Sequence, residues 1–82
     1  MHDAQDDLPP DLVRILDTLY DAYQLGQAPL SLARLAKRSQ LRMSTLRRFL
    51  TALQEAGIVS LDVREDGTGS AILTAAGLQL RH

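Results

Sequence analysis

Apolar residues recur at helical spacing near the start of the chain. Spacings of 3, 4, 7 and 11 residues place side chains on one face of a helix, and they relate Leu12, Ile15, Leu16, Leu19 and Tyr23. Val13 and Tyr20 flank this stripe, so the helix either only covers a core or also contacts a second subunit. Pro9-Pro10 suits the first turn of this helix, and Gly26 is a natural end to it.

Two further helices are predicted after a short connection. Ser31 is a suitable N-cap for the second helix, whose inward residues are Leu32, Leu35 and Ala36. The polar segment 39–42 breaks the helical phase and is the predicted turn, with Leu41 entering the core. The third helix is predicted over 43–56 and ends at Gly57. Its buried face consists of Leu46, Phe49, Leu50 and Leu53.

After Gly57 the apolar period changes from that of a helix to that of a strand. Val59, Leu61 and Val63 alternate with polar residues, and an Asp-Gly turn within 65–69 leads into a second strand over 70–74. Thr74 is a suitable cap for a last short helix over 75–80. The predicted fold is α+β and mainly helical: three helices, a two-stranded β-hairpin and a short C-terminal helix.

Length and composition are those of a single small domain. The 82 residues cannot divide their core, and a domain of this size gains much stability from dimerising. We expect residues 1–8 to form a disordered acidic tail and residues 9–82 to form the domain. The sequence lacks cysteine, an apolar run long enough for a membrane span and an apolar segment at its start, which favours a cytoplasmic location.

The charge of the chain is segregated along the sequence. Residues 22–54 contain six of the nine basic residues and no acidic residue, whereas residues 1–21 and 55–82 carry net charges of −5 and −2. The six basic residues are Arg34, Lys37, Arg38, Arg42, Arg47 and Arg48. Affinity for phosphates depends on local charge, so this segment favours a polyanionic partner although the net charge is −1.

The segment SLARLAKRSQLRMSTLRRFLTALQEAGIVS resembles the winged helix-turn-helix of bacterial transcriptional regulators. Its motifs are Leu35-Ala36 before the turn, Ser44-Thr45-Leu46 at the start of the third helix, and Leu53 followed by Gly57-Ile58-Val59. The closing Leu73-Thr74 and Gly77-Leu78 resemble the end of the wing in MarR-like and PadR-like families. Together these motifs cover about residues 30–80.

The resemblance implies sequence-specific binding of double-stranded DNA by a small dimeric regulator, with the helix at 43–56 in the major groove. The residues expected to reach the groove are Ser44, Thr45, Arg47, Arg48 and Thr51. The expected phosphate contacts are Arg34, Lys37, Arg38 and Arg42. Arg42 cannot cap the third helix as a serine or threonine would. On the wing the expected DNA contact is Arg64, whereas Glu65 and Asp66 would repel phosphates.

The acidic wing leaves a second interpretation open, in which the domain binds an acidic protein surface without DNA.

The residues offer no catalytic chemistry. The only histidines are His2 and His82, cysteine is absent, and no glycine-rich phosphate loop occurs. We therefore predict no enzyme activity, no metal and no cofactor. The target sequence and any small-molecule effector are left open.

Overall fold

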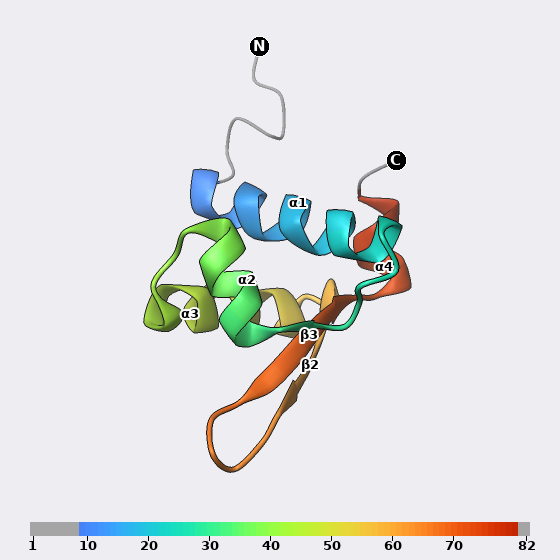
Figure 1. The fold of residues 1–82 in the computed structure, drawn as a ribbon. Helices are drawn as coiled ribbons and strands as arrows, with labels where there is room; N and C mark the ends of the chain where they lie inside the picture. The colour runs from blue at the N-terminus through green and yellow to red at the C-terminus, as the bar shows by residue number, and fades with distance from the viewer. Residues whose placement is uncertain (1–8, 81–82) are drawn as a thin grey trace.

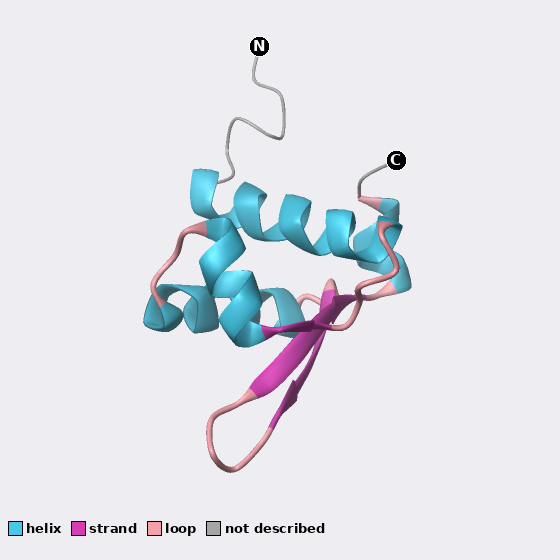
Figure 2. Ribbon diagram, in the orientation of Figure 1, coloured by secondary structure: helices cyan, strands magenta, loops and turns pink. Residues whose placement is uncertain are grey.

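The computed structural model describes residues 9–80 and follows the predicted order of elements (Figures 1 and 2). The helices are α1 (Pro10–Gln24), α2 (Leu32–Ser39), α3 (Met43–Glu55) and α4 (Ala75–Gln79), and the strands are β1 (Leu30–Ser31), β2 (Val59–Val63) and β3 (Gly69–Leu73). The predicted winged helix-turn-helix, mainly helical α+β, is confirmed. The predicted tail at 1–8 lies outside the described residues.

A third strand joins the hairpin that the sequence predicted. The sheet is antiparallel with the order β1-β3-β2, and Leu30 pairs with Ala71 while Ser31 pairs with Ser70. The sequence predicts only a connection and a helix cap at these positions, because two residues are too few to show strand periodicity. The pairing joins the start of α2 to the middle of the wing.

The core lies between the three long helices and the base of the sheet. It consists of Ile15, Leu19, Ala22, Leu30, Leu32, Leu35, Leu46, Leu50, Leu53, Val59, Ala71 and Leu73. Tyr23 was expected on the buried face of α1 but is 47% exposed, and Ala22 is fully buried instead. Val63 is 53% exposed, because the outer half of the hairpin projects beyond the helices (Figure 1).

Local hydrogen bonds explain where the helices begin and end. The predicted caps are confirmed: Arg34 N–H donates to Ser31 Oγ over 3.2 Å, and Gly77 N–H donates to Thr74 Oγ1 over 3.1 Å. Arg42 precedes α3 without a side-chain cap, as expected. Ser39, predicted in the turn, instead ends α2, where its buried hydroxyl donates to the Leu35 carbonyl. The chain then turns through a left-handed residue, Gln40 (φ 61°).

Candidate nucleic-acid interface

The outer face of α3 is the surface that the sequence singled out. Burial of Leu46 and Leu50 turns Ser44, Arg48 and Thr51 to solvent, and all three are exposed. Thr45, also expected to face outward, is half-buried. No acidic residue occurs on α3 before Glu55 at its last position. The first two turns of α3 therefore present hydroxyl groups and positive charge together.

The hydroxyl of Thr51 is already engaged within α3. Its Oγ1 donates to the Arg47 carbonyl over 2.9 Å, a bond between residues one turn apart. In this arrangement the Thr51 oxygen can still accept a hydrogen bond from a ligand but cannot donate one. The Ser44 hydroxyl donates no hydrogen bond within residues 9–80, so it can both donate a hydrogen bond to a ligand and accept one from it.

The basic residues of α2 and of the turn extend this surface. Arg34, Lys37, Arg38 and Arg42 are all exposed. Arg38 donates from Nη1 to Gln27 Oε1 over 2.9 Å. Within residues 9–80, Arg38 and Arg47 are the only basic residues whose side chains donate hydrogen bonds. The charges of Arg34, Lys37, Arg42 and Arg48 are therefore available to an external anion.

The tip of the wing is a well-defined three-residue loop. Arg64 N–H donates to the Thr68 carbonyl over 2.7 Å, and Gly67 N–H donates to the Arg64 carbonyl over 3.0 Å. Gly67 has a φ of 88°, a left-handed conformation that this loop requires and that glycine adopts without strain. The predicted Asp-Gly hairpin signal is confirmed.

The Asp66 carboxylate is turned back onto the wing. Its Oδ1 accepts the Thr68 hydroxyl over 2.6 Å and the Thr68 N–H over 3.0 Å. Two hydrogen bonds from Thr68 lower the pKa of Asp66 below its ordinary value of 3.8. The bond from the Thr68 hydroxyl has the larger effect, and the bond from its backbone N–H has the smaller one. This carboxylate therefore has a structural role in the turn, which accounts for one of the two acidic residues at the wing tip.

Arg47 joins α3 to the tip of the wing. Its Nη2 donates to the Gly67 carbonyl over 2.5 Å, between residues that are 20 apart in the sequence. The sequence places Arg47 among the groove-facing residues and does not reveal Gly67 as its partner, because no local pattern links a helix position to a distant carbonyl.

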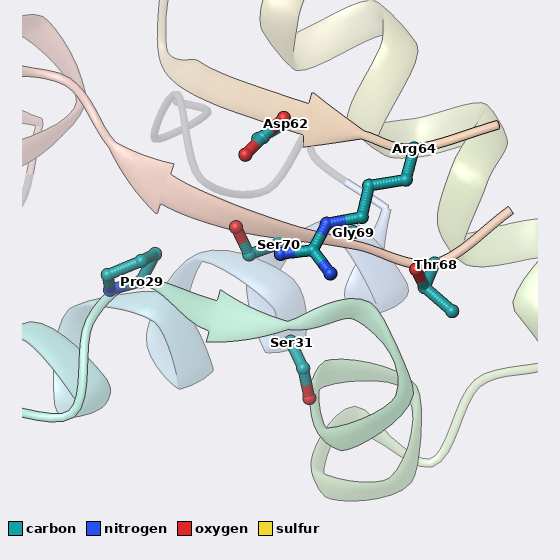
Figure 3. Close-up of a pocket in the computed structure, with 7 residues that line it drawn as sticks. All are labelled: Pro29, Ser31, Asp62, Arg64, Thr68, Gly69 and Ser70. Carbon is teal, nitrogen blue, oxygen red and sulfur yellow. The ribbon is translucent and has the colours of Figure 1, made fainter. Parts of the chain in front are cut away.

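Arg64 lies on a different part of the wing surface. It lines a pocket of about 310 Å³ with Pro29, Ser31, Asp62, Thr68, Gly69 and Ser70. Figure 3 shows the Arg64 side chain reaching from the end of β2 across β3 toward Ser70. The structure thus brings Arg64 near Ser31 at the start of α2. The lining is polar, unlike the apolar pockets that hold most small-molecule ligands.

The part of the chain that the structure describes also lacks two other features. No helix within residues 9–80 is both long and apolar enough to cross a membrane. The same residues contain no group of three histidine, cysteine, aspartate or glutamate side chains that could hold a metal ion.

Residues 12–62, more than half of the chain, match the model of the IclR helix-turn-helix domain. The chain belongs to this family. The winged helix-turn-helix part of the sequence-based resemblance is thereby confirmed, whereas the finer assignment to MarR-like or PadR-like families is not. A search of the curated proteins found no match to this IclR-type domain.

Solved structures include a similar protein from Ralstonia eutropha JMP134 that is described as a putative DNA-binding protein. It is 44% identical, with a TM-score of 0.81 over 89% of this chain and 91% of that chain. A MarR-family transcriptional regulator from Silicibacter pomeroyi is 27% identical, with a TM-score of 0.72 over 89% of this chain and 47% of its own. Neither the Ralstonia protein nor the Silicibacter regulator is described as an enzyme.

A variant of the Staphylococcus aureus regulator MepR, solved with a bound oligodeoxyribonucleotide, is also similar. It is 26% identical, with a TM-score of 0.72 over 93% of this chain and 54% of its own. The IclR-type domain described here thus spans about half the length of these MarR-family and MepR regulators, and about nine-tenths of the Ralstonia protein.

Proposed function

We propose that this domain binds double-stranded DNA in a sequence-specific manner and regulates transcription in the cytoplasm as a homodimer. The observation that carries the proposal is the exposed basic surface of α2 and α3, on which six basic residues occur without an intervening acidic residue. The IclR-type family supports it, as does the relative at 44% identity that is described as a putative DNA-binding protein. A partner with regularly spaced phosphates complements such a surface.

In this proposal α3 enters the major groove with its N-terminal half. Arg48 is the candidate for reading a base, because a guanidinium can donate two hydrogen bonds to one guanine. Ser44, Thr45 and Thr51 line the same entry, where hydroxyl groups mostly contact phosphates. Thr45 is half-buried and thus has the least access of the three.

Arg34, Lys37, Arg38 and Arg42 would contact phosphates and set affinity more than sequence choice. Arg38 would first have to leave Gln27, to which it donates a hydrogen bond. On the wing, Arg64 is the one basic residue that could contact a phosphate. Of the two acidic residues beside it, Asp66 is held by Thr68, whereas Glu65 carries a negative charge that opposes the contact.

The dimer surface that we propose combines the flank of α1 with α4. Tyr23 and Leu25 at the end of α1 and Leu80 after α4 are large apolar residues with high exposure. Burying them against a second copy would remove apolar surface from water. A dimer would present two α3 helices to half-sites about 34 Å apart, one turn of DNA.

A gel-shift titration tests DNA binding directly. Duplex DNA of mixed sequence should be retained at low salt and released at moderate salt. Lys37→Ala should weaken retention, whereas Arg14→Ala removes the same charge from an exposed position on α1 and should not. No retention at low salt, together with one stoichiometric protein partner in a pull-down, would instead favour an interaction module for an acidic protein surface.

A further inference from the structure

Beyond the pairing of Ser31 with Ser70, the wing has little to hold it against the rest of the domain. Val59 and Leu73 are buried at the base of the hairpin, but Val63, the last residue of β2, is 53% exposed. The residues of the loop itself are mostly exposed and polar. Apolar packing therefore fixes the base of the wing and leaves the tip without a comparable support.

Arg47 supplies the missing connection. Among the side-chain hydrogen bonds of residues 9–80, the bond from Arg47 Nη2 to the Gly67 carbonyl is the one that links the loop at 65–67 to a helix. A charged donor makes such a bond stronger than one between neutral groups. Its neighbour Arg48, one position further along α3, forms no such bond.

The loop is built to receive this contact. Gly67 is held in its left-handed conformation by its own N–H bond to Arg64, which leaves its carbonyl free to accept. A Cβ atom at position 67 would lie 3.2 Å from Arg47 Nη2, so glycine also leaves room for the guanidinium. The Asp66–Thr68 bonds stiffen the loop from within, so one external bond can orient the whole tip.

We infer that Arg47 is a positioning residue that holds the wing at a fixed angle to α3, so that both meet DNA as one rigid surface. Its effect on DNA binding passes through the Gly67 carbonyl, not through a base or a phosphate. This inference rests on the proposed DNA binding and refines the role of one residue in it. Preorganisation of this kind raises affinity because less ordering remains to be done on binding.

The first test needs no DNA. Backbone ¹⁵N relaxation of Gly67 and Thr68 should give order parameters near those of rigid backbone, about 0.85, in the unmodified protein and values falling toward about 0.6 in Arg47→Ala. Arg48→Ala, the matched loss of one charge on α3, should leave both residues rigid. A tip that stays rigid in Arg47→Ala, or that loosens equally in Arg48→Ala, would overturn the inference.

The second test separates positioning from direct contact with DNA. Residues 63–69 are replaced by Asn-Gly, which joins the paired residues Asp62 and Ser70 through a two-residue turn. Arg47→Ala should weaken binding about five-fold in the full-length wing, as expected for losing one hydrogen bond, and cause no further loss in the shortened wing. Equal losses in both backgrounds would show that Arg47 contacts DNA itself.

The two tests fail in different ways. If the shortened protein does not fold, the relaxation experiment still decides whether Arg47 orders the wing. If neither the unmodified protein nor any variant binds DNA, the proposed function is refuted. The relaxation result still shows whether α3 holds the wing tip.

Discussion

The affinity for DNA should fall steeply as the salt concentration rises, and the slope depends on how many phosphates the proposed interface neutralises. The proposed phosphate contacts there are four basic side chains, Arg34, Lys37, Arg38 and Arg42, of which Arg38 must first leave Gln27. Each phosphate neutralised on duplex DNA contributes about −0.9 to the slope of log affinity against log salt, so four contribute about −3.6 per subunit. Raising salt from about 50 to about 200 mM should then weaken binding about 150-fold per subunit.

Fluorescence anisotropy of a labelled duplex of mixed sequence, titrated at several salt concentrations, measures this slope. Lys37→Ala should change it to about −2.7, because one phosphate contact is lost. Arg14→Ala changes the net charge equally but lies on α1, outside the proposed interface, and should leave the slope unchanged. A slope near zero in the unmodified protein would refute the electrostatic basis of the proposal. An unchanged slope in Lys37→Ala would refute that residue's role.

Three further predictions address base reading, the core and the wing. Arg48→Ala should reduce the difference in affinity between preferred and random duplexes, whereas Lys37→Ala should weaken both alike; competition binding would reveal the reverse pattern if the roles are exchanged. Leu46→Ala should lower the free energy of unfolding in urea by about 2–5 kcal/mol, but Gln54→Ala, at an exposed position of the same helix, by about 0.5 kcal/mol or less; equal costs would contradict the assigned core. Because hydrogen bonds lower the pKa of Asp66, its support of the turn is fully present above the ordinary value of 3.8 and is lost as pH falls through the lowered pKa. Amide exchange of the loop should show this pH dependence and Asp66→Asn should abolish it; loss of order already near neutral pH would contradict the assignment.

Local patterns in the sequence predicted most of the fold. Caps and turns depend on residues a few positions apart, as in the bond between Ser31 and the N–H of Arg34. The buried face of α3 follows from the spacing of Leu46 and Leu50. These features need no knowledge of distant partners, which is why the helices, the hairpin and the two capped helix starts were predictable.

Features that depend on distant partners were missed. Strand β1 forms because Leu30 pairs with Ala71, and a segment of two residues carries no sequence pattern that predicts this pairing. Similarly, the partner of Arg47 is a backbone carbonyl, which has no sequence signature. Ala22 and Tyr23 both fall within the apolar arc of α1, so spacing alone could not decide which of them the core would bury.

The same limit applies to the proposed interface. The sequence identified its basic residues, but not that Arg38 and Arg47 are engaged by Gln27 and Gly67. Long basic side chains on a helix surface can point to solvent or to a neighbouring element, and only the packing of the elements decides between these. The structure therefore divides a set of residues that the sequence treated as equivalent.

Titration of ¹⁵N-labelled protein with a short duplex, followed by amide chemical shifts, shows which surface of the domain meets DNA. We predict that the largest changes occur in the first two turns of α3, at Ser44 and Arg48, with smaller changes on α2 and at the wing tip. Arg14, an exposed residue on α1 outside the proposed interface, should change little. Shifts absent at low salt, or concentrated on α1 while α3 stays unchanged, would contradict the assignment of α3 as the DNA-reading helix.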